Sequence, residues 1–161
     1  VKLPRCADTK GSIRHMISMA NELRILRKVR HPRVAAFHGA LIDASTCELC
    51  LVFELVQGVQ MDKFIRPPPM SPCATRRRKL MYDVACALSY LHAQDPPIIH
   101  GDLKPANVMV ERLANGLHAK LVDFGSSRVQ TRHAVPLGGT LQWKAPEVLL
   151  HDSSIPAPSA D

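Results

Sequence analysis

The sequence predicts an α+β fold in two lobes, and three observations point to it. The 161 residues are 46% hydrophobic and 22% charged, which is typical of a globular chain. Their patterns follow one another as helix, strand pair, break, helix, loop, strand pair and long loop. This order lacks the regular alternation of strand and helix that builds a doubly wound sheet. We therefore expect a first lobe over residues 1–56 and a second over residues 57–161, joined near residues 54–58.

The first lobe is expected to contain a helix over residues 12–30 and a pair of strands. Ser12 is the expected N-cap. Pro32 ends the helix, because proline disfavours the helical conformation in the residue before it. The apolar runs Val34–Leu41 and Leu49–Leu55 then predict antiparallel strands. The helix should bury one stripe of residues spaced three or four apart, namely Ile13, Met16, Ile17, Ala20, Leu23, Leu26 and Val29.

The second lobe begins after a break at residues 57–60 and a proline-rich loop at residues 66–72. Two short strands, Val108–Val110 and Ala119–Val122, are expected to form a hairpin, because Asn-Gly favours the positive φ of a tight turn. The remainder reads mostly as loop, with a helix beginning near Pro146. Between the proline-rich loop and the hairpin, residues 76–93 predict a helix that buries one face, made of Met81, Val84, Leu88 and Leu91.

Charge and cysteine content restrict the class of protein. The formal net charge is +7, and the basic residues gather at residues 23–31 and 76–79. No aromatic residues interleave with them, so we interpret both runs as solvated helix faces and expect no nucleic-acid partner. The five cysteines are odd in number and show no paired framework, which favours reduced thiols and a cytoplasmic location. No apolar run reaches the ~18 residues of a membrane span.

Four polar residues could form a site for phosphate chemistry. Asp102, Lys104 and Asn107 can face one ligand from a single tight loop, and Asp123 follows the predicted hairpin that returns the chain to it. Asp102 would accept a proton from a hydroxyl, and Lys104 would neutralise a phosphoryl group. Asn107 and Asp123 would offer oxygens to Mg²⁺, which prefers carboxylate, amide and phosphate ligands. Alone, "DLKP" would be no more than a turn, and "DFG" would be no more than a chance match.

Taken together, the motifs resemble the signature set of eukaryotic-type protein kinases. "HGDLKPAN", "DFG" and "GTLQWKAPE" occur in the kinase order and at kinase-like spacing. "DLKPAN" is similar to serine/threonine kinases, and "GTLQWKAPEV" is closest to the tyrosine-kinase-like group, most of which phosphorylate serine and threonine. The resemblance implies a two-lobed kinase fold, ATP and Mg²⁺ as cofactors, and a protein substrate. It places Gly139, Thr140 and Glu147 in the activation segment, with Thr140 bracing Asp102.

The resemblance also assigns residues outside these motifs. Lys2 matches the lysine that pairs with the α- and β-phosphates, and Glu22 matches its ion-pair partner. Asp161 would anchor the catalytic loop from below. The nucleotide would meet the gatekeeper Phe53, the backbone of Glu54 and Val56, and Met109 beneath the adenine. A hydrophobic spine would stack Leu26, Phe37, His100 and Phe124.

Two departures from the family pattern have consequences. Gly101 stands where most kinases have an arginine that binds a phosphate on the activation segment. We therefore expect activity to depend little on phosphorylation at Ser126, Ser127 or Thr131, so phosphatase treatment before an assay should leave it unchanged. The resemblance also places a glycine-rich loop before Val1. After Asp161 it places further helices, with an arginine for Glu147.

We interpret the chain as part of a catalytic domain, incomplete at both ends. Uncovered apolar surface is expected on the second helix and the catalytic loop. The leading functional hypothesis is ATP-dependent phosphorylation of serine and threonine hydroxyls in proteins, and the alternative is an inactive pseudokinase that serves as a binding module. The retained Lys2, Glu22, Asp102, Asn107 and Asp123 favour the enzyme. A basic nucleic-acid binder ranks far lower.

Overall fold

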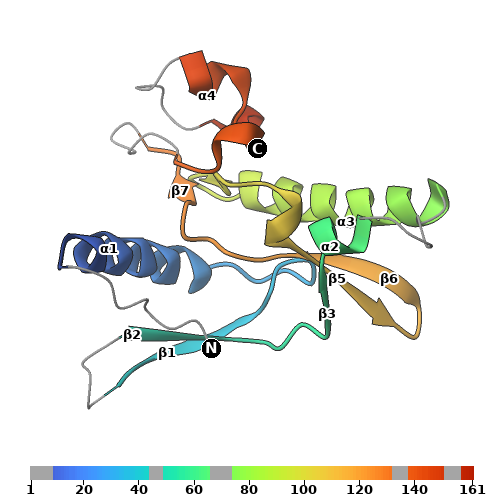
Figure 1. Ribbon diagram of the computed structural model, residues 1–161, viewed down its shortest axis with the longest axis horizontal. Coiled ribbons are helices and arrows are strands. Elements are labelled where there is room, and N and C mark those ends of the chain that lie inside the picture. The colour runs from blue at the N-terminus through green and yellow to red at the C-terminus, as the bar shows by residue number, and fades with distance from the viewer. Residues whose placement is uncertain (1–8, 44–48, 66–73, 132–137, 151–156) are drawn as a thin grey trace.

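The computed structural model describes residues 9–43, 49–65, 74–131, 138–150 and 157–161, with side chains from residue 17 onward. In Figure 1, α1 lies beside the β1–β2 pair and α3 lies over β6. The α+β class is confirmed. In chain order the helices and strands are α1 (Thr9–Leu26), β1 (Phe37–Ile42), β2 (Leu49–Phe53), β3 (Gly58–Gln60), α2 (Met61–Ile65), α3 (Ala74–His92), β4 (Ile98–Ile99), β5 (Val108–Leu113), β6 (Gly116–Leu121), β7 (Arg128–Val129) and α4 (Pro146–Leu150).

The first strand pair is antiparallel, as predicted, but it starts later than the apolar run does. Phe37 pairs with Phe53, and Ile42 pairs with Leu49. Val34 instead forms a parallel bridge with Leu121, at the end of β6. The prediction of a strand from Val34 was wrong at its beginning, because this part of the run bonds the second hairpin. It thereby joins the two halves of the chain.

The second sheet has the strand order β3-β5-β6. Its β5–β6 hairpin was predicted, but β3 lies in the stretch that we expected to be a break. A side chain at Gly58 would place Cβ 2.1 Å from the Val110 carbonyl oxygen, so only glycine allows this pairing. The hairpin turn differs by one residue from the prediction. Leu113 pairs with Gly116, which leaves Ala114 and Asn115 in the turn.

The buried face of α1 differs from the predicted stripe. Ile17 is 65% exposed, whereas Met19, Glu22, Ile25 and Leu26 are buried. The helix also ends four residues early and begins before Ser12, so Ser12 is not its N-cap. At its end, the N–H groups of residues 28 and 29 bond the carbonyls three residues back, which tightens the last turn. Of the predicted stripe, Leu26 and Val29 are buried and Ile17 and Ala20 are exposed, while the side chains of Ile13 and Met16 lie outside the described residues. The stripe was wrong at Ile17 and Ala20 because the buried line runs through Met19 and the Glu22 carboxylate instead.

The helix over residues 76–93 is confirmed as α3, although one predicted core residue is not in the core. Met81 is 63% exposed. The buried residues are Leu80, Asp83, Val84, Ala87 and Leu91. Asp83 lies among them because its carboxylate accepts hydrogen bonds from Lys79 Nζ (2.6 Å) and Ala119 N–H (3.1 Å). It also forms an ion pair with Arg33 Nε (3.2 Å). Asp83 thus ties α3 to β6 and to the residues after α1.

One hydrophobic cluster runs through both halves of the chain. It contains Leu26 and Phe37 from the first half and Leu91 and Phe124 from the second. All four predicted spine residues are buried, and the His100 ring meets the Phe124 ring edge-on at 5.1 Å between centroids. The division at residues 56 and 57 stays a prediction. In the part of the chain that the structure describes, no helix is both long enough and apolar enough to cross a membrane.

Candidate active site

A cavity of about 390 Å³ lies between the two halves of the chain. This volume is within the range of small-molecule sites, ~300–1,000 Å³. Six of the predicted nucleotide contacts line it, and the seventh, Lys2, lies outside the described residues. The ten lining residues are Glu22, Ala35, Phe53, Glu54, Leu55, Val56, Met109, Val122, Asp123 and Phe124. Sequence reasoning missed Ala35, Leu55 and Val122, because isolated aliphatic residues carry no motif.

The segment after β2 offers backbone groups to this cavity. Glu54 N–H bonds the Ala36 carbonyl (2.8 Å), and Val56 O accepts from Gly58 N–H (2.9 Å). Outside the strand ladders, no backbone bond among the described residues uses the Glu54 carbonyl or the Val56 N–H. One acceptor and one donor, two residues apart, match the edge of a purine base. Phe53 packs edge-on against Phe37, with the ring centroids 5.7 Å apart, and forms part of the cavity wall next to this segment.

The Glu54 side chain ties the same segment to the second lobe. Both of its oxygens accept from Lys120 Nζ at 2.7 Å, and one also accepts from Ala36 N–H. Burial alone would raise the pKa of Glu54, but the hydrogen bonds from Lys120 and Ala36 outweigh it and lower the pKa. Glu54 therefore remains ionised at neutral pH. The Lys120 contact was not predicted, since 66 positions separate the two residues.

Asp102, Lys104 and Thr140 form a compact network. Asp102 Oδ1 accepts from Thr140 N–H and from Thr140 Oγ1, both at 2.8 Å. Asp102 Oδ2 accepts from Lys104 Nζ (2.6 Å) and from Asn107 Nδ2 (3.1 Å). Lys104 Nζ also reaches Thr140 Oγ1 at 2.6 Å. The loop residues that the motif predicted are thus together, and the activation segment braces Asp102 as the resemblance implied.

These contacts set the charge of Asp102. Burial of the carboxyl group would raise its pKa, but the hydrogen bonds from Lys104 and Thr140 outweigh it and lower the pKa. Asp102 is therefore a carboxylate at neutral pH. Its side chain is still 12% exposed, so an incoming hydroxyl can reach it.

A close approach of two glycines brings Thr140 to Asp102. A Cβ on Gly139 would lie 2.5 Å from the Gly101 carbonyl oxygen and 3.4 Å from Asp102 Oδ1. Gly139 also has a φ of 85°, a conformation that side chains disfavour. Both facts require glycine at this position. Glu147, by contrast, is exposed on α4, apart from this network.

Asn107 and Asp123 suit a magnesium ion. Asn107 Nδ2 donates to Asp102, so its carbonyl oxygen Oδ1 faces away from those acceptors. Asn107 O accepts from Val122 N–H at 3.0 Å, which brings the residue before Asp123 to the loop. Asp123 is exposed at the cavity wall. One amide oxygen and one carboxylate fit an ion that is usually held by one or two carboxylates, waters and substrate phosphates.

The His100 ring contacts the backbone of the loop at Asp102 and the residue before Asp123. Burial is the main effect on His100 and lowers its pKa, while the charges of Asp161, Asp123 and Asp102 act in the opposite direction. The ring is therefore neutral at neutral pH. Its Nε2 faces the Val122 carbonyl at 3.2 Å, and its Nδ1 faces Asp102 N–H at 3.4 Å. The tautomer with a proton on Nε2 satisfies both contacts.

Asp161 anchors the catalytic loop, as the resemblance implied. Its carboxylate is fully buried and accepts from His100 N–H (2.7 Å) and Gly101 N–H (2.8 Å). His92 Nε2 lies 3.0 Å from the same group. One side chain therefore holds two consecutive amides of the loop in place.

We expect Asp161→Ala to lower the free energy of unfolding by about 2–6 kcal/mol. Two amides lose their acceptor, and each unsatisfied donor costs ~1–3 kcal/mol. Urea unfolding followed by circular dichroism measures this change. The exposed Asp95 supplies the matched control Asp95→Ala, which should change the free energy by under ~0.5 kcal/mol. Equal unfolding midpoints for both variants would contradict the anchoring role.

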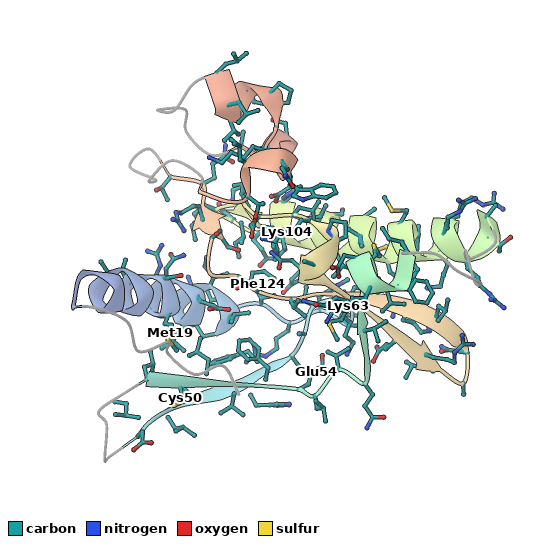
Figure 2. The ribbon with its side chains drawn as sticks, viewed as in Figure 1. Met19, Cys50, Glu54, Lys63, Lys104 and Phe124 are labelled. Atoms are coloured by element: carbon teal, nitrogen blue, oxygen red, sulfur yellow. The ribbon has the colours of Figure 1, made fainter. Side chains whose placement is uncertain are left out.

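Phe124 is buried and lines the cavity. Figure 2 shows it beside the C-terminal end of α1, between Lys104 and Glu54. Its N–H faces Glu22 Oε1 at 3.3 Å, and Glu22 is 1% exposed. The pairing of Glu22 with Lys2 stays a prediction, because Lys2 is not among the described residues.

Comparison with known proteins identifies relatives over most of the chain. A family model described as the protein kinase domain matches residues 5–161. A mimivirus protein named as a serine/threonine-protein kinase/receptor, R826, is 30% identical over 86% of the chain and 8% of its own length. Two Arabidopsis thaliana proteins named as serine/threonine-protein kinases, SIS8 and CTR1, are 34% and 33% identical over 82% and 83% of the chain. The chain spans 13% and 16% of their lengths.

Proposed function

Because this chain belongs to the protein kinase family, we propose that it carries the catalytic core of an ATP-dependent serine/threonine kinase. The names of the relatives support this substrate class, since those described above are named as serine/threonine kinases. The reaction would join an acceptor hydroxyl oxygen to the γ-phosphorus of ATP. The bond from that phosphorus to the bridging β,γ-oxygen would break, and ADP would leave.

Asp102 and Lys104 are the proposed catalytic residues. The ionised Asp102 would orient the acceptor hydroxyl and take its proton as the new bond forms. Lys104 lies 2.6 Å from Asp102 Oδ2 and would stabilise negative charge on the transferring group. Thr140 holds Asp102 Oδ1 through two hydrogen bonds, so the carboxylate needs little reorganisation during the reaction.

The nucleotide is proposed to occupy the cavity at the junction of the lobes. The Glu54 carbonyl and the Val56 N–H would bind the adenine edge, Met109 would lie beneath the ring, and Phe53 would close the back. Lys2 and Glu22 would fix the phosphates. Asn107 and Asp123 would hold Mg²⁺, which supplies charge neutralisation and orientation of the triphosphate.

The observation that carries the proposal is the network around Asp102. A carboxylate held ionised, with a lysine and a threonine on its two oxygens, is prepared to receive a hydroxyl. The direct test is transfer of radiolabel from [γ-³²P]ATP to a basic protein by the full-length protein, with and without Mg²⁺. Transfer to serine and threonine is the expected result, as phosphoamino-acid analysis would show.

The transfer assay, together with calorimetry of Mg·ATP binding, separates the alternatives. Binding of Mg·ATP without transfer to any acceptor would favour the pseudokinase hypothesis and refute the proposed kinase activity. Label on tyrosine alone would refute the serine/threonine assignment.

A further inference from the structure

We propose that Ser18 and Asn21 of α1 are positioning residues for Asp123. The inference rests on the proposed function, because it concerns how the metal-binding carboxylate of that site is held. The sequence analysis assigned no role to either residue. What connects them to Asp123 is a set of long-range hydrogen bonds to the backbone that follows it.

Three neighbouring side chains on α1 bond this backbone. Ser18 Oγ donates to the Gly125 carbonyl at 3.0 Å, and Asn21 Nδ2 donates to the Ser127 carbonyl at 2.7 Å. Glu22 Oε1 accepts from Phe124 N–H at 3.3 Å. Positions 18, 21 and 22 share one face of a helix, since residues three and four apart are neighbours there. The helix is thus joined to residues 124–127 by three hydrogen bonds, of which the one between Phe124 N–H and Glu22 Oε1 is the longest.

The same segment is tied to the catalytic loop on its other side. Ser127 Oγ donates to the His100 carbonyl at 2.8 Å, and Ser127 N–H bonds the Phe124 carbonyl at 3.0 Å. Ser127 is fully buried. Residues 124–127 therefore lie between α1 and the catalytic loop and are hydrogen-bonded to both.

Asp123 depends on this support because of its backbone conformation. Its φ is 64°, in the left-handed region that a residue other than glycine keeps only when its surroundings hold it there. Asp123 is exposed, and its Oδ1 accepts a hydrogen bond from Gly125 N–H at 3.3 Å, so the segment that α1 holds also helps to direct its carboxylate. Loss of the Ser18 and Asn21 contacts would let this backbone move and would weaken the magnesium site.

This arrangement also bears on regulation. Ser18 and Asn21 order this backbone through neutral hydrogen bonds, which require no phosphate on the activation segment. Ser127 cannot receive a phosphate while its hydroxyl is buried against His100. We therefore infer that α1 supplies here the ordering that Gly101 cannot supply through a bound phosphate.

The test uses Ser18→Ala, Asn21→Asp and the double variant in the full-length protein. Asn21→Asp keeps the shape of the side chain but replaces the donor with a carboxylate that cannot bond the Ser127 carbonyl. The matched control is Ala20→Ser, a change at an exposed neighbour on the same helix. Calorimetry of ATP binding at a series of Mg²⁺ concentrations, and hydrogen exchange at amides 124–127, are the two readouts.

Each single variant should raise the Mg²⁺ concentration for half-maximal ATP binding about 2- to 10-fold, the worth of one hydrogen bond. ATP binding without Mg²⁺ should stay within ~2-fold of the parent. Exchange at amides 124–127 should become faster in the variants and remain unchanged in Ala20→Ser. In the transfer assay, the defect should appear as a higher Mg²⁺ requirement rather than as a lower kcat at saturating Mg²⁺.

Variants that match Ala20→Ser in both readouts would overturn the proposal. If circular dichroism shows that Asn21→Asp loses helical structure, the test rests on Ser18→Ala alone. That variant removes only one hydroxyl oxygen. A parent that binds Mg·ATP but transfers no phosphate would refute the kinase activity, and the binding and exchange readouts would still decide the role of α1. A parent that does not bind Mg·ATP would refute both.

Discussion

Asp102→Asn should lower kcat for phosphoryl transfer about 10³-fold, the usual worth of a positioned general base. Asparagine cannot take the proton of the acceptor hydroxyl. Its amide group can still accept from Thr140 on one side, so the loop should stay in place. On the other side the new NH₂ group faces Lys104 Nζ and Asn107 Nδ2, two donors, and the Lys104 contact is lost. The KM for ATP should change by under ~3-fold, because Asp102 does not line the cavity.

Steady-state kinetics with saturating protein substrate checks this expectation. The exposed Asp95, in the loop after α3, supplies the matched control Asp95→Asn, which makes the same chemical change away from the network. Its kcat should equal that of the parent. An Asp102→Asn variant with a kcat within about threefold of the parent would remove Asp102 from the mechanism.

The local parts of this site were predictable from sequence, because the residues that form it are close together in the chain. Asp102, Lys104 and Asn107 lie within six positions, and a short loop can bring them to one point. The β5–β6 hairpin was predicted for the same reason, since a turn and two apolar runs specify it locally.

Long-range partners were not predictable in this way. The contacts of Lys120 with Glu54 and of Ser18 with Gly125 depend on how distant segments pack. Nothing in the local pattern of serine, asparagine or lysine distinguishes such residues from solvated ones. Periodicity also placed Ile17 and Ala20 on the core face of α1 incorrectly, because the buried Glu22 interrupts the apolar line that periodicity detects. A carboxylate buried in the core therefore prevents the hydrophobic pattern from identifying the helix face that carries it.

Short elements were missed for a related reason. β3 has three residues, and its glycine is there to let the Val110 carbonyl approach, not to break a strand. Val34 reads as part of an apolar strand, yet it bridges to Leu121 across the junction of the lobes. In both places the partner strand, and not the sequence of the segment itself, decides the structure.

Asp123→Asn should abolish the dependence of ATP binding on Mg²⁺ and lower transfer by at least about 100-fold. Loss of one metal-binding carboxylate is worth several kcal/mol, and each ~1.4 kcal/mol is a factor of ten in rate. Asparagine is the right replacement because asparagine and aspartate both tolerate the left-handed backbone, so the φ of 64° at this residue can be kept. Alanine would disturb the backbone as well as remove the ligand.

The two aspartates can be told apart by one comparison. In calorimetry, Asp102→Asn should keep the Mg²⁺ enhancement of ATP binding, whereas Asp123→Asn should lose it; both should lose transfer. Chelation of Mg²⁺ with EDTA should bring the parent down to the ATP affinity of Asp123→Asn and should leave that variant unchanged. Retained Mg²⁺ enhancement in Asp123→Asn would show that its carboxylate does not hold the metal. The assignment of separate proton and metal roles to the two acidic residues would then fail.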